Sequence, residues 1–363
     1  MKIINVVGAR PNFMKIAPLI EALKKYPSIK QVLVHTGQHY DYKLSKIFFD
    51  ELNIPEPDIN LEAGSGGRDY QIKEISERFK SVLLKEKPDL VVVVGDVNST
   101  IACASAAKES GVKVAHIEAG LRSFDLSMPE ELNRIETDKI SDFLFITEEG
   151  AFANLAREGI SKNKIFFVGN VMIDTLIRNI EKSRKSRIID ELGLEKKNFI
   201  VSTIHRPSNV DKKKDLLKIL EIFEEIQNKI KIILPLHPRT RKSIQKFQLD
   251  DKIRQLKNLI ITEPLGYLDF LSLISNSKGV ITDSGGVQEE TTYLRIPCIT
   301  MRSNTERPET ITKGTNLLVG SSKSSILDAF NQIMDGTFKR GDIPKFWDGN
   351  AAERIAKILI TNQ

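Results

Sequence analysis

The sequence is poor in cysteine and contains no long apolar run. Its 363 residues include two cysteines, Cys103 and Cys298, which stand far apart in apolar segments. They offer neither a disulfide framework nor the spacing of a metal site, so we expect both to be buried as small hydrophobic side chains. No apolar run reaches the roughly 20 residues that span a bilayer. We therefore expect a protein of the reducing cytoplasm, without a membrane segment.

Common site signatures are also missing. Neither GxxxxGKS/T nor, after the first strand, GxGxxG occurs, which removes the two most frequent nucleotide-binding motifs. The five histidines form no HxH or HExxH pattern, so we expect no metal site built by side chains. The chain leads from Met1 straight into a predicted strand, and we expect no signal peptide.

The composition is that of a globular protein, with 40% apolar and 28% charged residues. A chain of 363 residues exceeds one typical core, so we expect two domains. The net charge of +6 slightly favours small anionic ligands and does not require nucleic acid as a partner.

Strands and helices alternate along the whole chain, which predicts an α/β protein with doubly wound parallel sheets. The expected strands of the first half are 2–7, 32–35, 90–94, 112–116, 143–146 and 165–168. The pattern restarts with strands at 199–203, 231–236, 259–262, 279–282, 297–301 and 316–319. We expect one domain at 1–170 and another at 171–350. Motifs at the carboxyl ends of strands would line a cleft between them, because ligands bind there in open parallel sheets.

The segment 281–309 contains the clearest signal for anion binding. A predicted strand ends in Asp-Ser-Gly-Gly and enters a helix, whose first N–H groups are free to bind an anion. Gly285 and Gly286 allow a close approach, and Ser284 can cap the helix or donate to an oxygen. The turn could form a diphosphate cradle together with Arg10, Lys15, His205 and Arg307. Two alternatives are an ordinary capped turn and, for residues 306–309, a surface loop of ion pairs.

Three carboxylates stand at positions that suit acid/base chemistry: Asp96, Glu118 and Glu130. The first two end consecutive predicted strands, and Glu130 begins the helix after the Glu118 loop. Carboxylates that converge raise one another's proton affinity, so that one can serve as an acid while another serves as a base. The alternative is structural: Asp96 and Glu130 cap their helices, and Glu118 pairs with Arg122.

Two histidines stand near arginines at predicted strand ends. His205 is followed by Arg206, and His237 by a proline and an arginine. A histidine beside an arginine is suited to contact an anion or a leaving group. We expect His35 and His116 to be structural residues at strand ends.

These motifs form an ordered set that spans nearly the whole chain. The set is Gly8-x-Arg10-Pro11-x-x-x-Lys15, Thr36-Gly37-Gln38-His39, Gly95-Asp96, Glu118-Ala119-Gly120-Leu121-Arg122, Pro129-Glu130-Glu131-x-Asn133-Arg134, His205-Arg206, His237-Pro238, Asp283-Ser284-Gly285-Gly286-x-Gln288-Glu289-Glu290 and Arg302-x-x-Thr305-Glu306-Arg307-Pro308. Each motif is weak alone, but the whole set resembles the UDP-N-acetylglucosamine 2-epimerases, and most of all their non-hydrolysing kind.

The resemblance implies a GT-B fold, in which two Rossmann-like doubly wound domains face a central cleft and the last helix, 351–363, returns to the first domain. It implies reversible conversion of UDP-N-acetylglucosamine to UDP-N-acetylmannosamine for cell-surface polysaccharide precursors. The reaction would use no NAD, metal or other cofactor, and the protein would be a homodimer.

The resemblance also implies roles for individual residues. Asp96, Glu118 and Glu130 would form the acid/base set, and His205 would contact the diphosphate or assist the leaving group. Departure of UDP makes the C2 proton removable and gives a 2-acetamidoglucal, to which UDP returns. The expected substrate contacts are Arg10, Lys15, Arg206, His237, Phe270 (near uracil), Ser284, Gly285, Gly286, Glu290 (on the ribose) and Arg307.

Three other functions share some of these features. A hydrolysing relative would release UDP and N-acetylmannosamine with the same motifs. A glycosyltransferase of the same fold does not need three carboxylates in the first domain. A catalytically silent nucleotide-sugar binding protein would gain nothing from these carboxylates and would bear their repulsion.

Overall fold

The computed structural model describes residues 1–37, 50–64 and 66–362, apart from the side chain of Arg10. The chain divides into two compact units. Unit 1 comprises Met1–Arg178 and Lys345–Gln363, and unit 2 comprises Asn179–Pro344.

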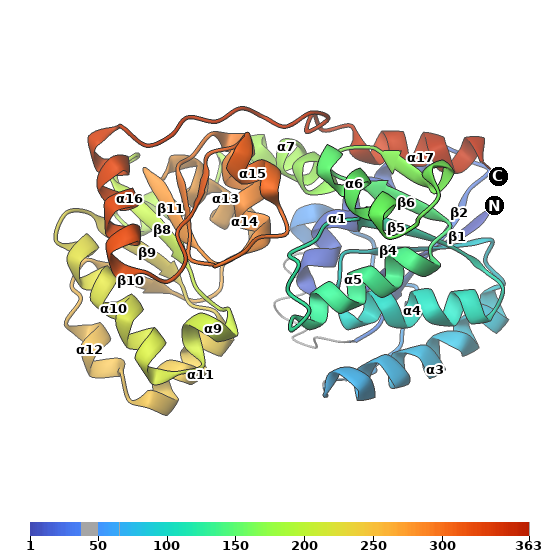
Figure 1. Ribbon diagram of the computed structural model, residues 1–363, viewed down its shortest axis with the longest axis horizontal. Helices are drawn as coiled ribbons and strands as arrows, with labels where there is room; N and C mark the ends of the chain where they lie inside the picture. Colours follow the sequence, from blue (N-terminus) through green and yellow to red (C-terminus); the bar gives the residue numbers. More distant parts are fainter. Residues whose placement is uncertain (38–49, 65, 363) are drawn as a thin grey trace. The chain divides into compact units, whose positions relative to one another are not determined.

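Unit 1 contains a parallel sheet, which has seven strands within the described residues (Figure 1). The strand order is β3-β2-β1-β4-β5-β6-β7, so the direction of winding reverses between β1 and β4. Its strands are β1 (Lys2–Val7), β2 (Lys30–His35), β3 (Ile59–Asn60), β4 (Leu90–Val94), β5 (Lys113–Ala119), β6 (Phe143–Ile146) and β7 (Ile165–Phe167).

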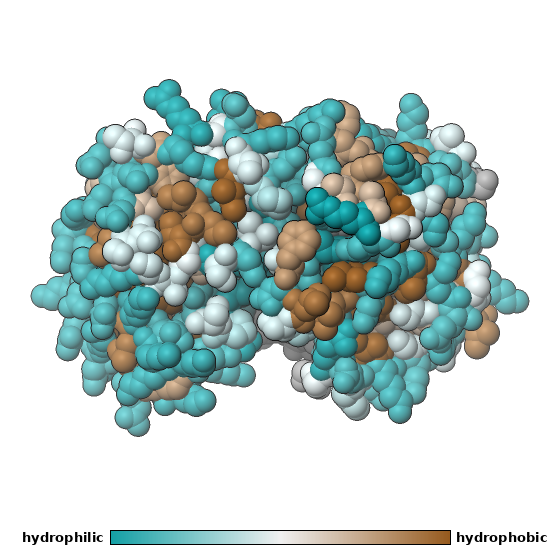
Figure 2. Space-filling view, viewed as in Figure 1, coloured by the Kyte–Doolittle hydropathy of each residue, from teal (hydrophilic) through white to brown (hydrophobic). Residues whose placement is uncertain are grey.

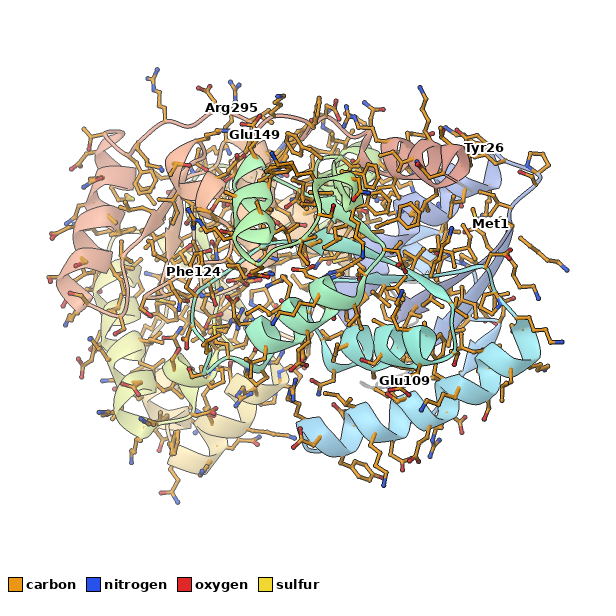
Figure 3. The ribbon with its side chains drawn as sticks, turned by 45° about the vertical axis from the view of Figure 1, so that its right-hand side comes forward. Met1, Tyr26, Glu109, Phe124, Glu149 and Arg295 are labelled. Atoms are coloured by element: carbon orange, nitrogen blue, oxygen red, sulfur yellow. The ribbon has the colours of Figure 1, made fainter. Side chains whose placement is uncertain are left out.

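Helices connect these strands. They are α1 (Arg10–Lys24), α3 (Arg68–Glu86), α4 (Asn98–Glu109), α5 (Pro129–Ile140), α6 (Glu149–Arg157) and α7 (Val171–Ser183), with the 3-10 turn η1 (Lys162–Lys164) and the last helix α17 (Ala351–Thr361). Figure 3 labels Glu109, where α4 ends.

The core of unit 1 explains why β4 lies in the middle of the sheet. Its sequence LVVVV is buried at every position, as expected of a β-branched run in a strand covered on both faces. Val91 and Val93 belong to a cluster with Ile75 and Phe79 of α3. The small side chains of α4, including Cys103, complete this cluster.

Unit 2 contains a second parallel sheet, whose six described strands have the order β10-β9-β8-β11-β12-β13. They are β8 (Phe199–Thr203), β9 (Lys231–Pro235), β10 (Leu259–Thr262), β11 (Gly279–Thr282), β12 (Cys298–Thr300) and β13 (Asn316–Leu318). The helices are α8 (Ile188–Glu191), α9 (Pro207–Val210), α10 (Lys213–Gln227), α11 (Pro238–Phe247), α12 (Asp250–Arg254), α13 (Tyr267–Asn276), α14 (Gly285–Leu294), α15 (Pro308–Thr312) and α16 (Lys323–Asp335).

The two cysteines are buried, which confirms the prediction made for them. Burial raises the pKa of the Cys103 thiol and raises that of Cys298 to about 11. Both thiols are therefore protonated near neutral pH and serve as packing groups.

The division between the units falls within α7, eight residues after the end of the expected domain 1–170. The first half of α7 belongs to unit 1 because its polar side chains are bound there. The Thr175 hydroxyl donates to the Met14 carbonyl. The Asp174 carboxylate accepts the backbone N–H groups of Ala351 and Ala352 at 3.1 and 2.7 Å, and so caps α17.

Across the ranges that the structure describes, no helix is both long enough and apolar enough to cross a membrane. On the face shown in Figure 2, hydrophilic residues predominate and apolar residues form separate patches. One exposed apolar side chain is Phe124, in the loop after β5 and labelled in Figure 3.

Candidate functional site

Three of the predicted site residues in unit 1 lie at the carboxyl ends of neighbouring strands. Lys15 is in α1, which follows β1, whereas Asp96 follows β4 and Glu118 is the last residue but one of β5. Because β1, β4 and β5 are adjacent in the sheet, these ends share one edge. The structure therefore brings Lys15, Asp96 and Glu118 to the same part of unit 1.

Lys15 and Glu118 form an ion pair whose side chains are 7% and 1% exposed. Gly95 lies against this pair: a Cβ atom at position 95 would be 3.2 Å from Lys15 Nζ and 3.3 Å from Glu118 Oε2. Glycine keeps this space open and also accepts the φ of +73° found there. Asp96, the next residue in the chain, is thereby held beside the pair.

Glu118 has a backbone conformation that residues with a side chain rarely adopt, with a φ of +72°. The pairing of β5 with β6 shifts register between Ile117 and Ala119, so Glu118 occupies a β-bulge. Bulges redirect a side chain, and strained residues of this kind cluster at active sites at a cost of about 1–3 kcal/mol. The bulge gives an independent structural reason to place Glu118 in the site.

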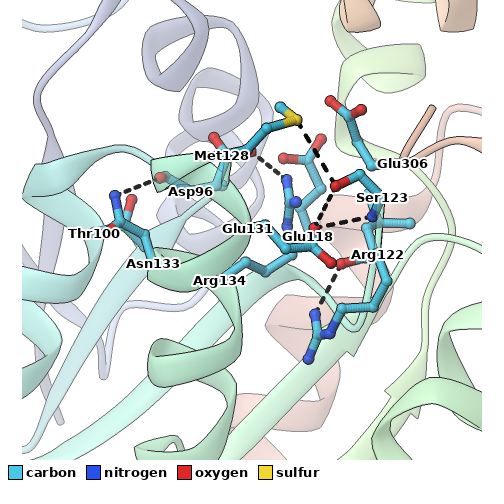
Figure 4. Close-up of polar contacts among 12 residues, drawn as sticks. Asp96, Thr100, Glu118, Arg122, Ser123, Met128, Glu131, Asn133, Arg134 and Glu306 are labelled. Carbon is cyan, nitrogen blue, oxygen red and sulfur yellow. Dashed lines mark hydrogen bonds and ion pairs between the residues drawn. The ribbon is translucent and has the colours of Figure 1, made fainter. Parts of the chain in front are cut away.

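Asp96 is bound by α5 (Figure 4). Nη2 of Arg134, a fully buried residue, lies 2.5 Å from Asp96 Oδ2. The Asn133 amide donates to the Asp96 carbonyl at 3.0 Å. The N-cap residue of α4 is Val97, so the alternative that Asp96 caps this helix is wrong. The pairing of Glu118 with Arg122 is also wrong, because Glu118 pairs with Lys15.

Glu130 and its neighbour Glu131 differ in their surroundings. Glu130 is half-buried in the first turn of α5, whose N-cap residue is Met128. Glu131 is buried and accepts the N–H of Ser123 at 2.9 Å, its hydroxyl at 3.0 Å and the N–H of Phe124 at 3.0 Å (Figure 4). Glu131 therefore anchors the loop after β5. In the sequence, only its position next to Glu130 drew attention to this residue.

Asp283 organises the strand ends of unit 2, although sequence reasoning assigned it no role of its own. Its carboxylate accepts the N–H groups of His205 and Arg206 and the amide of Asn209, each at 2.9 Å. His205 Nδ1 lies 2.9 Å from the same carboxylate. Burial acts to raise the pKa of Asp283, but the bond and charge of His205 and the other donors hold it below its usual value. His205 Nε2 is then the ring nitrogen available to a ligand.

The start of α14 combines open N–H groups with a guanidinium. Ser284 is the N-cap residue, but its hydroxyl makes no capping bond, which contradicts the alternative of an ordinary capped turn. A Cβ atom at Gly285 would be 2.4 Å from Nη1 of Arg307, so glycine allows this guanidinium to lie against the turn in its present position. A helix start beside a buried arginine suits an anion.

Three arginines share one glutamate beside this helix start. Glu306 Oε2 lies 2.8 Å from Arg302 Nη2, and Glu306 Oε1 lies 2.7 Å from Arg307 Nη1 and 3.7 Å from Arg206 Nη2. Arg307 also pairs with Glu289 at 2.9 Å. Glu306 and Arg307 are buried, so the surface-loop alternative is wrong. Three guanidinium groups therefore gather around Glu306 beside the start of α14.

The remaining predicted contacts of unit 2 lie on nearby helices. Burial, and then the neighbouring Glu290 carboxylate, raise the pKa of Tyr267 on α13. Phe270, also on α13, is half-buried and packs against the core. His237 is exposed and caps α11, because its Nδ1 accepts the N–H of Arg239 at 3.1 Å.

Some predicted residues cannot be placed in full. Gln38 and His39 lie outside the described residues, as does the side chain of Arg10. Gly286 is half-buried in the first turn of α14. Within the described part of the chain, no group of three or more His, Cys, Asp or Glu side chains is arranged to hold a metal ion.

Comparisons with known proteins place this geometry in a family. Residues 21–360 match the family model described as UDP-N-acetylglucosamine 2-epimerase. The UDP-N-acetylglucosamine 2-epimerase of Methanocaldococcus jannaschii is 46% identical over 365 residues, covering 99% of each chain. A UDP-2,3-diacetamido-2,3-dideoxy-D-glucuronate 2-epimerase of Pseudomonas aeruginosa is 40% identical, again covering 99% of each.

A solved structure extends the likeness to the fold. The crystal structure of the M. jannaschii UDP-GlcNAc 2-epimerase in complex with UDP-GlcNAc and UDP matches with a TM-score of 0.92 and 44% identity, covering 99% of this chain and all of the other. The predicted fold class, α/β with two parallel sheets of the GT-B type, is thereby confirmed. The motif resemblance is confirmed as well, and the chain belongs to the UDP-N-acetylglucosamine 2-epimerase family.

Proposed function

We propose that this chain interconverts UDP-N-acetylglucosamine and UDP-N-acetylmannosamine by inverting the configuration at C2, without net hydrolysis. The observation that carries the proposal is the buried Lys15–Glu118 pair beside Asp96, in a chain of this family. The complex of the M. jannaschii relative with UDP-GlcNAc and UDP supports the same substrate here.

The reaction proceeds by elimination and return. A base removes the C2 proton, the released electron pair forms the C1=C2 double bond, and the C1–O bond breaks with its electrons passing to UDP. The intermediate is 2-acetamidoglucal. An acid then protonates C2 on the opposite face while the UDP oxygen bonds to C1 again. The steps balance without an oxidant and require a base, an acid and a tight hold on UDP.

Unit 1 supplies the acid/base groups in this proposal. Asp96, Glu118 and Glu130 act as one set, with no assignment to a face of C2. Glu118 is held by Lys15 and by its bulge, and Asp96 is held by Arg134. Such preorganised groups need no rearrangement when the reaction occurs.

Unit 2 holds UDP. The open start of α14 and the three arginines around Glu306 suit a diphosphate, and His205 Nε2 is suited to contact the leaving oxygen. The proposed contacts in unit 2 are Arg206, His237, Phe270, Ser284, Gly285, Gly286, Glu290 and Arg307. Arg10 and Lys15 complete the proposed substrate contacts from unit 1.

Incubation with UDP-N-acetylglucosamine in D₂O, followed by NMR, tests the proposal. We expect deuterium at C2 and UDP-N-acetylmannosamine with its UDP attached. Free UDP with N-acetylmannosamine would show the hydrolysing reaction, and binding without turnover would show a silent binding protein. A parallel incubation with UDP-2,3-diacetamido-2,3-dideoxy-D-glucuronate tests the substrate of the P. aeruginosa relative. Faster exchange with that sugar would overturn the assignment of UDP-N-acetylglucosamine.

The resemblance further supports a homodimer that works in the cytoplasm. Light scattering on the purified protein tests the first part, with an expected mass of twice that of one chain. Fractionation of source cells tests the second.

A further inference from the structure

His116 is fully buried in β5 and bound at both ring nitrogens. Its Nδ1 lies 2.7 Å from Asp138 Oδ1, and its Nε2 lies 2.7 Å from the Gly95 carbonyl oxygen. A carbonyl oxygen only accepts hydrogen bonds, so Nε2 must carry a proton. An ionised carboxylate also only accepts, so Nδ1 must carry one as well. A neutral ring would place a lone pair against one of these two oxygens.

Asp138 is ionised because of what surrounds it. Its Oδ2 accepts the N–H of Gly120 at 3.0 Å and lies 2.7 Å from Nη2 of Arg122. The positive charge of Arg122 against Oδ2 favours an ionised Asp138 over a protonated one that donates to His116.

The charges of the network balance only if His116 is a cation. Asp138 faces it from α5, Arg122 from the segment after β5, and Glu158, at the end of α6, pairs with Arg122 at 2.7 Å. With His116 protonated, two positive groups meet two negative ones. With His116 neutral, these four groups would have one excess negative charge, shared with Glu158, whose side chain is 24% exposed. On its own strand, the nearby Glu118 is already paired with Lys15.

We propose that His116 is a buried imidazolium that positions both Asp96 and Glu118 for the reaction. One side of the ring fixes the carbonyl of Gly95, the residue before Asp96. The other side acts through Asp138 on the N–H of Gly120, two residues after Glu118. The role in catalysis rests on the proposed function, whereas the protonation state does not.

The backbone at these points explains why positioning is needed. Gly95 and Gly120 have φ angles of +73° and +75°, and Glu118 lies between them in sequence at +72°. The Gly95 N–H also donates to the Ile117 carbonyl at 3.0 Å, which ties the end of β4 to β5. Without the imidazolium these left-handed turns lose a shared anchor. A shift of about 1 Å in a reacting group can reduce a rate roughly 100-fold.

His35 provides an internal contrast, since it is buried at the end of β2 in the same sheet. Its Nδ1 accepts the N–H of Gly37 at 3.0 Å, so this nitrogen carries no proton and the ring is neutral. Burial lowers the pKa of His35. Two strand-end histidines of one sheet therefore differ in charge. His35 is neutral because its ring accepts the Gly37 N–H, whereas both ring nitrogens of His116 face acceptor oxygens.

NMR of the whole protein, with histidine labelled by nitrogen-15, tests the charge state near neutral pH. We expect protons on both ring nitrogens of His116 and on only one of His35. The His116 signals are assigned by elimination, using variants that lack each of the other four histidines in turn. An unprotonated ring nitrogen at His116 would overturn the proposal, whatever the enzyme's activity.

Kinetics of His116→Gln and Asp138→Asn test the positioning role. We expect C2 deuterium exchange to slow roughly 100-fold at saturating substrate, with UDP affinity changed by less than about threefold. Glu158→Gln removes only the partly exposed partner of Arg122 and should slow the exchange less than either of these two variants. Unchanged exchange in both His116→Gln and Asp138→Asn would overturn the role. If the wild type binds UDP but exchanges nothing, the proposed function fails, and NMR still decides the charge of His116.

Discussion

Lys15 and Glu118 are separated by 103 residues in the chain and meet as an ion pair with 7% and 1% of their side chains exposed. Removing one member of such a buried pair typically costs about 3–5 kcal/mol. Removing both costs much less. The pair therefore links the stability of unit 1 to the residue that we propose for catalysis.

A double-mutant cycle separates these two effects. We expect Lys15→Met and Glu118→Gln each to lower the free energy of unfolding by about 3–5 kcal/mol, and the double variant to lower it by less than the sum. Exchange at C2 should be lost in every variant that lacks Glu118. Chemical denaturation and the D₂O assay measure the two quantities. Additive stability changes would show that the two side chains do not interact energetically.

Glu130 and Glu131 are adjacent and provide matched variants. Glu130→Gln should slow C2 exchange at least about 100-fold with little loss of stability, because a general acid or base of this kind contributes about 10²–10⁴-fold. Glu131→Gln should instead cost about 1–3 kcal/mol, since three hydrogen bonds from the loop after β5 depend on its carboxylate. Thermal unfolding together with the exchange assay compares them. The reverse pattern would assign the catalytic carboxylate to Glu131.

Ser284→Ala tests the retention of UDP. The hydroxyl makes no capping bond on α14, so the melting temperature should stay within about 2 °C of the wild type. We expect weaker UDP binding and a larger release of free UDP and 2-acetamidoglucal per epimerisation. NMR quantifies both products. Wild-type levels of leakage would remove Ser284 from the proposed UDP site.

Asp174 gives unit 1 a dependence on pH. Burial raises its pKa from 3.8 to about 6, against the N–H groups of Ala352 and Ala351, which favour the ionised form. A raised pKa means that the folded state binds the proton more tightly. The stabilisation is therefore complete below the ordinary pKa and is lost as pH rises through about 6. The difference between these two pKa values corresponds to at most about 3 kcal/mol of unfolding free energy.

Asp174→Asn should remove this dependence. Relative to the variant, the wild type should lose up to about 3 kcal/mol of unfolding free energy between about pH 4 and 7, measured by urea denaturation. Asp211→Asn in unit 2 is the control, because the hydrogen bond from Arg239 lowers the pKa of Asp211. The contribution of this aspartate to the unfolding free energy is nearly constant over this pH range and is lost only at lower pH. Parallel pH curves for the wild type and Asp174→Asn would contradict the prediction.

The fold class was predictable from the sequence because its signals are local. Apolar runs such as Leu90–Val94 predict buried strands wherever they occur, and their alternation with helices restricts the sheets to the parallel kind. Glycine turns such as Gly285–Gly286 mark strand ends in the same way. Short elements such as α8 and β3 were not predicted, since two to four residues show no periodicity.

The sequence by itself therefore determined the family, the two sheets and the strand ends that bear functional groups. The tertiary structure alone decided which partner each charged group has. Lys15 rather than Arg122 binds Glu118, Glu131 anchors a loop, and Asp138 meets His116 across 22 residues. The physical reason is distance along the chain. Local propensity determines on which helix, strand or turn a charged residue lies. Only the packing of strands and helices brings charges from remote parts of the chain into contact and removes the water that would otherwise screen them.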